Sequence, residues 1–291
     1  MRKFALHLVC IFCAFLMNGI ATANEPETIH LWKKGAPGFE KLKDIPESAK
    51  DWWVRDINNP SIVVFKPEKE LANGTAILVV PGGGHQNLVY NSEGKAPAEF
   101  LTKLGITVFV LKYRLVFQEN SPYSIDIHPQ QDAYRAMRTI RSRAVEFGID
   151  PNKLGIMGFS AGGEVVASIA YAAGNGDPKA KDPVDRANGK PNFQILVYPG
   201  PRWIPTSLDP AAPPAFMVAA MDDACCAKPI IDLAQLYQVA KIPAEIHLYA
   251  KGDHAFNMGQ RTTLKGLHDW PQRLADWLID SKWIPSPTAK P

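Results

Sequence analysis

The chain has 291 residues, of which 46% are hydrophobic and 21% charged, and its formal net charge is +3. This composition is typical of a globular protein and excludes a disordered, collagen-like or coiled-coil chain. The net charge is too small to indicate a nucleic-acid partner, which requires a concentrated basic surface. The length fits one large α/β domain or two small ones.

The first 23 residues have the pattern of a secretory signal peptide. Arg2 and Lys3 precede an apolar run from Phe4 to Met17, and Ala21-Thr22-Ala23 supplies the small residues of a cleavage site. The run is too short for an ordinary transmembrane helix, and an uncleaved membrane anchor is the alternative. We therefore expect a secreted or periplasmic protein, cleaved after Ala23, with no stable membrane insertion after cleavage.

The rest of the chain predicts an arm, a main domain and a tail. Residues 24–60 are polar and aromatic with several prolines, and they predict an irregular arm lying across the main domain, residues 61–284. Residues 285–291 form the tail. The segment 177–192 is polar and rich in Lys, Asp, Pro and Gly, and its length indicates an insertion near the site or a mobile cover.

Strands and helices alternate along the main domain. In chain order, apolar or β-branched runs predict strands over 61–65, 75–80, 106–111, 154–158, 193–198, 215–220 and 244–249. Apolar residues at helical spacing predict helices over 96–104, 129–144, 165–172, 230–240 and 270–279. This alternation predicts an α/β fold with a mostly parallel central sheet and helices on both faces.

The strongest chemical signal is Gly158-Phe159-Ser160-Ala161-Gly162, which fits G-x-S-x-G and lies between a predicted strand and a predicted helix. Such a turn presents the Ser160 hydroxyl at the carboxyl end of the sheet. The helix that follows points its N-terminus at the same place, and its dipole favours a developing negative charge. A glycine-rich turn with an incidental serine is the alternative interpretation.

A second glycine-rich loop, Pro81-Gly82-Gly83-Gly84-His85, directly follows the strand predicted over 75–80. Three consecutive glycines let backbone N–H groups approach a ligand closely. Such a loop supplies one half of an oxyanion hole, and the N–H group of Ala161, after the serine, supplies the other. A phosphate-binding loop is the alternative, but neither G-x-x-x-x-G-K-[ST] nor G-x-G-x-x-G followed by a helix is present.

A serine nucleophile needs a base, and in this architecture an acid and then a histidine follow the serine. Three histidines lie far enough along the chain. His247 lies inside a predicted strand and His268 at the start of the last helix, whereas His254 lies in a loop just past the strand 244–249. We therefore predict that His254 is the base.

The acid is expected after the strand 215–220, where Asp222 and Asp223 are adjacent. Side chains alternate at the end of a strand, so only one of the two can face the histidine, and we favour Asp223 over Asp222. Two solvated turn aspartates are the alternative. Asp253 is a weaker candidate, because it would point away from the ring of its neighbour.

Cysteine usage predicts neither a metal site nor a cofactor. Beyond the predicted signal peptide, the chain has only Cys225 and Cys226. These neighbours could form a disulfide in an oxidising compartment, but two small buried thiols are the favoured interpretation. The sequence contains no HExxH motif and no other cluster with metal-ligand spacing.

With these motifs in place, the sequence resembles the esterase branch of the α/β-hydrolase fold, which includes hormone-sensitive-lipase-like carboxylesterases, acetyl xylan esterases and feruloyl-esterase-like enzymes. The matching stretches are PGGGH at 81–85, LKYRL at 111–115, QDAYRAMRTIRSRA at 131–144, LGIMGFSAGGE at 154–164, ILVYPG at 195–200, PPAFMVAAMDD at 213–223 and PAEIHLYAKGDHAF at 243–256. They run through nearly the whole main domain in consistent order.

The resemblance implies roles for six residues. It places Ser160, Asp223 and His254 on a catalytic triad. It places Gly83, Gly84 and Ala161 on the oxyanion hole. Two features depart from the pattern: Pro81 precedes the glycines and His85 follows them, and Ala224-Cys225-Cys226 stands where many members have a Pro-x-Val run after the acid.

The resemblance implies a secreted serine carboxylesterase for short acyl esters, including acetyl esters of xylan or related polysaccharides. His85 and Trp203 are secondary candidates for substrate binding. Trp203 follows a strand at the sheet edge where sites lie, and either stacking on a sugar ring or packing on the arm would explain it. The alternatives are a serine peptidase, an amide hydrolase or lactonase on the same fold, and a catalytically silent binding protein. The sequence does not indicate an oligomeric state.

Overall fold

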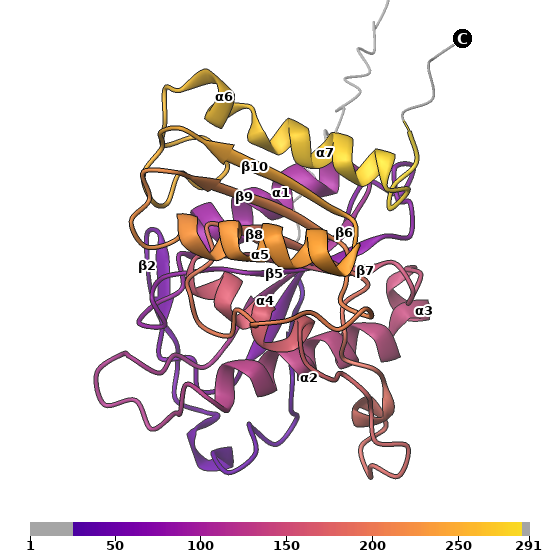
Figure 1. Ribbon diagram of the computed structural model, residues 1–291. Coiled ribbons are helices and arrows are strands. Elements are labelled where there is room, and N and C mark those ends of the chain that lie inside the picture. The colour runs from indigo at the N-terminus through magenta and orange to yellow at the C-terminus, as the bar shows by residue number, and fades with distance from the viewer. Residues whose placement is uncertain (1–25, 287–291) are drawn as a thin grey trace, which may run out of the picture.

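An eight-stranded sheet forms the centre of the computed structural model, which describes residues 26–286 (Figure 1). The predicted signal peptide and residues 287–291 of the predicted tail lie outside the described residues. In spatial order the strands are β1 (Thr28–His30), β4 (Ser61–Phe65), β6 (Thr107–Lys112), β5 (Ala76–Val80), β7 (Leu154–Phe159), β8 (Phe193–Val197), β9 (Ala215–Ala220) and β10 (Ala244–Tyr249). The strands from β6 to β10 are mutually parallel, and only β4 runs against its two neighbours. The predicted α/β class with a mostly parallel sheet is confirmed.

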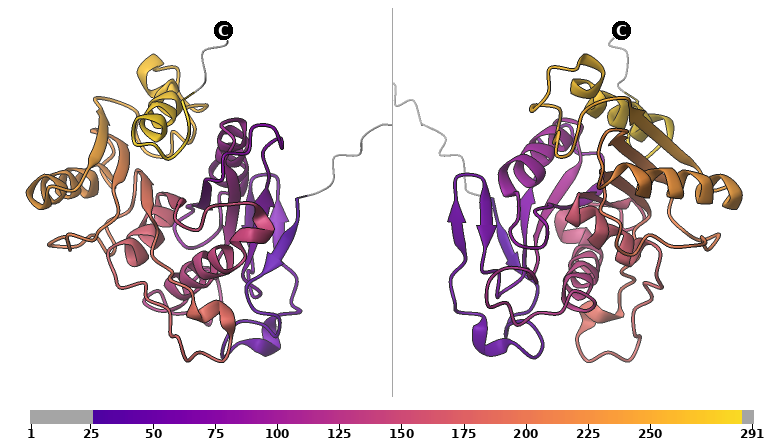
Figure 2. Two further views of the ribbon diagram at one scale, coloured as in Figure 1. Left: turned by 90° about the vertical axis from the view of Figure 1, so that its right-hand side faces the viewer. Right: turned by 60° about the vertical axis from the view of Figure 1, so that its left-hand side comes forward.

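Helices cover both faces of this sheet. They are α1 (Ala96–Lys103), α2 (His128–Ser142), α3 (Ala144–Phe147), α4 (Ala161–Ala170), α5 (Ala227–Ala240), α6 (Lys265–His268) and α7 (Trp270–Asp280), with short turns η1 (Glu40–Leu42), η2 (Asn91–Lys95) and η3 (Pro183–Arg186). Helices α2, α4 and α5 lie on one face, and α1 and α7 lie on the other (Figures 1 and 2). Among residues 26–286, no helix combines the length and the apolar character needed to cross a membrane.

Burial on both faces explains why the central strands are continuous apolar runs. Every residue of β5, β7, β8 and β9 is buried. Parallel strands covered by helices on both sides have no solvent-facing side, so alternation of polar and apolar residues is lost. The edge strand β10 is only partly buried, and it mixes polar and apolar residues.

The last described residues pack against the amino ends of the central strands. The Thr75 hydroxyl, just before β5, donates to the carbonyl of Trp283 at 2.5 Å. The Trp283 ring stacks on Phe193, at the start of β8, with 4.4 Å between centroids. This end of the sheet is opposite the carboxyl ends of the strands.

The arm is more regular than the sequence predicts. Its strand β1 pairs antiparallel with β4 and extends the sheet, and β2 (Ser48–Lys50) and β3 (Trp53–Arg55) form a separate antiparallel pair. The prediction of an irregular arm is therefore wrong in part. Each of these strands has three residues, which is too short for a period-2 pattern to be visible.

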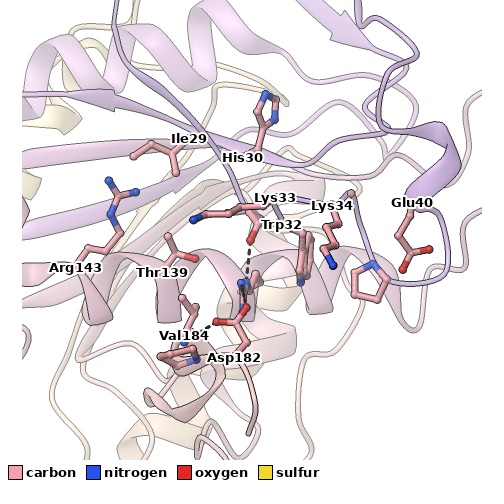
Figure 3. Close-up of a pocket in the computed structure, with 15 residues that line it drawn as sticks. Ile29, His30, Trp32, Lys33, Lys34, Glu40, Thr139, Arg143, Asp182 and Val184 are labelled. Atoms are coloured by element: carbon pink, nitrogen blue, oxygen red, sulfur yellow. Dashed lines mark hydrogen bonds and ion pairs between the residues drawn. The ribbon is translucent and has the colours of Figure 1, made fainter.

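The segment 177–192 packs against α2. Arg135 of α2 contacts two of its carboxylates, Asp182 at 2.5 Å and Asp185 at 2.9 Å. A cavity of about 870 Å³ lies between the arm, α2 and this segment (Figure 3). Trp32 and Thr139 line it together with Asp182, but none of the predicted site residues does.

A buried ion pair ties the loop after β6 to α2. Arg114 and Asp132 are both fully buried, with Arg114 Nη2 2.6 Å from Asp132 Oδ1. The backbone N–H of Arg114 also donates to Asp132 Oδ2 at 2.9 Å. The guanidinium lies within 5.8 Å of three aromatic ring centroids, those of Trp32, Phe39 and Tyr123. The pair therefore joins the arm, the sheet and α2 at one point.

We expect Asp132→Ala to lower the free energy of unfolding by about 3–5 kcal/mol, because it leaves the buried Arg114 charge without a partner. Urea denaturation would measure the loss. The matched control is Asp232→Ala, which breaks the exposed Lys228–Asp232 pair on α5 and should change stability by less than about 1 kcal/mol. Equal losses in the two variants would contradict this account of the buried pair.

Candidate active site

Ser160 occupies a sharp turn between β7 and α4. Its backbone has φ 49° and ψ −120°, a strained conformation for a residue with a side chain. Two glycines make the turn possible. A Cβ on Gly162 would lie 2.0 Å from the carbonyl oxygen of Val80, and one on Gly158 would lie 2.4 Å from that of Gly162. Helix α4 therefore starts at Ala161, four residues before the predicted start, and its N-terminus abuts the serine.

The three predicted polar residues meet at the carboxyl ends of β7, β9 and β10. Ser160 Oγ lies 2.9 Å from His254 Nε2, and His254 Nδ1 lies 2.7 Å from Asp223 Oδ2. The Asp223 side chain is 1% exposed and the His254 side chain is 33% exposed. A buried carboxylate thus orients an imidazole that can still reach solvent and a hydroxyl.

The two adjacent aspartates have different partners. Asp223 Oδ1 accepts the backbone N–H groups of Cys225 and Cys226, each at 3.1 Å, while Oδ2 faces the histidine. Asp222 points the other way, as strand alternation predicts. Its carboxylate accepts the N–H groups of Asp253 at 2.9 Å and of Gly252 at 3.2 Å.

Asp222 therefore holds the loop that carries His254. The hydrogen bond from the Asp253 N–H, the largest influence, lowers the pKa of the Asp222 carboxyl. From the sequence, Asp222 and Asp223 are alternatives for the acid that faces the histidine. No sequence pattern indicates that the other aspartate holds the histidine loop. Among the described residues, the Asp253 side chain makes no hydrogen bond to the ring of His254, which is bonded to Asp223 instead.

The glycine-rich loop lies directly against the serine. A Cβ on Gly82 would be 2.9 Å from Ser160 Cβ. Gly83 and Gly84 have φ values of 120° and 63°. Within residues 26–286, neither of their N–H groups has a backbone or side-chain acceptor. Ala161 is the first residue of α4, so its N–H also lacks an intrahelical partner. Two segments next to the serine therefore carry free N–H groups.

His85, at the end of the glycine-rich loop, anchors that loop to α4. Its ring is 2% exposed, and Nε2 lies 2.9 Å from Oε2 of Glu164 on α4. The ring also packs edge-on against Tyr113 and Phe117. The prediction of a substrate contact for His85 is not supported, because these neighbours bury the ring. Trp203, the other secondary candidate, is half-buried in the loop after β8.

A buried glutamate that the sequence did not single out connects three loops of the site. Glu93, in η2, accepts the Gly82 N–H at 2.8 Å and the Tyr198 hydroxyl at 3.0 Å. The Tyr198 oxygen also accepts the backbone N–H of Asn257, and its ring packs edge-on against His254 at 4.9 Å. Glu93 lies in a polar stretch that resembles any helix start, so no sequence signal identifies it.

A disulfide joins Cys225 and Cys226, immediately after the acid. The favoured expectation of two free thiols is therefore corrected. Cys226 is buried and Cys225 is exposed. Adjacent cysteines carry no spacing pattern that separates a disulfide from two thiols, so the sequence could only leave both possibilities open.

The comparisons with known proteins agree with this geometry. Residues 77–212 match a family model described as the α/β-hydrolase fold. This chain has the α/β-hydrolase fold. The matched segment contains the glycine-rich loop and the Ser160 turn, which are the two parts that define the site.

Similar proteins include esterases. The chain is 30% identical over 268 residues to the acetylxylan esterase of Xylanibacter ruminicola, and the match covers 80% of this chain. The chain spans only about half of that relative, 50% of its length. Two solved structures share the fold. The acetyl ester-xyloside bifunctional hydrolase of Caldicellulosiruptor lactoaceticus has a TM-score of 0.72 and 24% identity, over 90% of this chain and 98% of that one. A thermophilic esterase of Thermogutta terrifontis has a TM-score of 0.67 and 20% identity, over 92% and 96%.

Glu93 generates a prediction about pH. Burial raises the pKa of its carboxyl from 4.5 to about 7, more than its hydrogen bonds lower it. Between pH 4.5 and pH 7 the Glu93 carboxyl has lost its proton in the unfolded chain but keeps it in the folded chain. The free energy of unfolding therefore falls as pH rises, by up to about 3 kcal/mol above pH 7. Glu93→Gln should abolish this fall, as urea denaturation at pH 5 and pH 8 would measure.

The control for Glu93 is Glu99→Gln. Glu99 is a half-exposed glutamate on α1, and this variant should keep the wild-type difference between the two pH values. A Glu93→Gln protein whose stability still falls like the wild type would show that Glu93 does not take up a proton on folding.

Proposed function

We propose that this α/β hydrolase is a serine carboxylesterase that cleaves short acyl esters. The observation that carries the proposal is the hydrogen-bonded series from Ser160 through His254 to Asp223, set beside the free N–H groups of the glycine-rich loop. A hydroxyl, an imidazole and a buried carboxylate in this order are what acyl transfer through a serine requires.

The proposed reaction begins with the serine. His254 Nε2 takes the proton of Ser160 Oγ as that oxygen attacks the ester carbonyl. Asp223 keeps the other ring proton on Nδ1 and stabilises the imidazolium that forms. The imidazolium then gives its proton to the leaving alcohol, which departs and leaves an acyl group on the serine. A water molecule, deprotonated by the same imidazole, then attacks the acyl carbon. The bond from that carbon to Ser160 Oγ breaks, the acid leaves, and the imidazolium returns its proton to Oγ.

Charge on the carbonyl oxygen is stabilised by backbone donors. When the tetrahedral intermediate forms, the oxyanion accepts N–H groups from Gly83, Gly84 and Ala161. These donors are fixed before the reaction, so little reorganisation is needed, and each such donor contributes about 3–4 kcal/mol to lowering the barrier. The N-terminus of α4 adds its dipole at the same point.

The proposed substrates are acetyl esters on xylan or related polysaccharides. Support comes from the 30% identity to the acetylxylan esterase of Xylanibacter ruminicola. The signal-peptide pattern of residues 1–23 supports export, to the medium or the periplasm, where such polymers or their fragments are found.

The two adjacent aspartates provide a matched test of the mechanism. Asp223→Asn should lower kcat for p-nitrophenyl acetate by about 10⁴-fold, because the imidazole loses its correct tautomer. Asp222→Asn should cause a much smaller loss, because it weakens only the support of the loop, and Ser160→Ala should remove the activity. A greater loss from Asp222→Asn than from Asp223→Asn would mean that Asp222, and not Asp223, orients His254. Full activity of Ser160→Ala would refute the proposal.

A substrate panel tests the specificity. We expect p-nitrophenyl acetate to be hydrolysed faster than the butyrate, and the butyrate faster than the octanoate, and we expect acetate release from acetylated xylan. Methyl ferulate and p-nitroacetanilide provide comparison with an aromatic ester and an amide. Faster cleavage of the anilide than of the acetate ester would favour an amide hydrolase, and labelling of Ser160 by a fluorophosphonate would exclude a silent binding protein.

A further inference from the structure

Four potential metal ligands, one of them the acid Asp223, lie together at the site. One ligand atom each from Asp223, Cys225, Cys226 and His254 lies within 4.8 Å of the other three. The sequence does not predict a metal site here, because these residues have no recognised ligand spacing. The fold creates the cluster by placing the loop after β10 against the loop after β9, where His254 Nδ1 lies 2.7 Å from Asp223 Oδ2.

We propose that the reduced form of this cluster binds a soft divalent cation such as Zn²⁺, and that the bound metal switches the enzyme off. Two thiolates, an imidazole nitrogen and a carboxylate oxygen form a four-ligand set of the kind that Zn²⁺ prefers. The disulfide prevents binding, because its sulfurs are joined to each other. The inhibitory part of the proposal rests on the proposed function, while metal binding itself does not.

Conversion of the disulfide form into the metal-bound form takes two steps, reduction of the disulfide and binding of the metal. A dithiol reductant delivers two electrons and two protons, so that Cys225 and Cys226 become thiols while the reductant becomes a disulfide. Metal binding then releases both thiol protons and the proton on His254 Nδ1. In the reverse direction a small-molecule disulfide accepts two electrons from the two thiolates and, with two protons from solvent, becomes two thiols. Cys225 and Cys226 rejoin as a disulfide, the metal leaves, and His254 Nδ1 takes up a proton from solvent.

The surroundings suit this binding. The backbone N–H groups of both cysteines donate to Asp223 Oδ1, which fixes the cysteines beside the carboxylate and leaves Oδ2 facing the histidine. Cys225 is exposed and His254 is one-third exposed, so an ion can enter from solvent, whereas Cys226 and Asp223 are buried.

Inhibition follows from the position of His254. A metal on Nδ1 replaces the proton that Asp223 orients, and it withdraws electron density from the ring. The opposite nitrogen, 2.9 Å from Ser160 Oγ, then becomes a poor base. Because the thiols exist only in reducing surroundings, the metal would hold the enzyme inactive where thiols stay reduced and leave it in an oxidising compartment.

The experiment uses the full chain in two forms, oxidised and reduced with dithiothreitol, with the reductant removed under argon. Co²⁺ is the spectroscopic probe, because cobalt bound to thiolate shows charge-transfer absorption. We expect the reduced form to take up one Co²⁺ per chain with this absorption, and the oxidised form to show none. In the same samples Zn²⁺ should abolish p-nitrophenyl acetate hydrolysis by the reduced form, a chelator should restore it, and the oxidised form should be unaffected.

Two variants complete the test. The double variant C225S/C226S keeps both backbone donors to Asp223, and it should lack the cobalt absorption and the difference in zinc response between reduced and oxidised samples. His268→Asn, which removes an exposed histidine outside the cluster, should behave like the wild type. Zinc inhibition of equal strength in the wild type and the double variant would overturn the proposal, as would a reduced chain without cobalt uptake.

Failure of the proposed function has a different signature. If the reduced chain binds cobalt through thiolate but the oxidised chain hydrolyses no ester, the metal site stands and the esterase proposal falls.

Discussion

The strained backbone of Ser160 is the constraint on which the site depends. A side-chain-bearing residue with φ 49° costs free energy, and surrounding structure must enforce it. Here β7 is buried along its whole length, α4 begins at the next residue, and Val80 leaves no room for a side chain at Gly162. The close approach that strains the serine also brings the glycine-rich loop and the start of α4 next to it. Strain and donor geometry therefore have one origin.

Carboxylates fix the loops around this turn. Glu93 accepts a backbone N–H of the glycine-rich loop, Asp223 accepts two from its own loop, and Asp222 accepts two from the His254 loop. Glu164 accepts the N–H of Arg202 after β8. Loops at the edge of a parallel sheet have many unpaired backbone donors, and the side-chain oxygens of these acidic residues satisfy several of them.

Sequence patterns predicted the parts of the molecule that depend on local order. The strands β5, β7, β8 and β9 are continuous apolar runs because both faces are covered, and the Ser160 turn has a motif because its glycines are sterically required. Strand order then places His254 and an aspartate near the serine.

What the sequence could not predict depends on contacts between distant segments. Glu93 is important because of Gly82 and Tyr198, which are 11 and 105 residues away. The division of roles between Asp222 and Asp223 depends on a loop 31 residues further along. The short strand β1 exists only because β4 offers an edge for pairing. None of these contacts between distant segments produces a periodic pattern in the sequence.

The tether between Thr75 and Trp283 has a practical consequence for handling the protein. It holds the end of the described chain beside the amino ends of the central strands, on the rim farthest from Ser160. An affinity tag or a solid support attached at Ser286, the last residue that the structure describes, would thus leave the serine open to bulky, insoluble polymers.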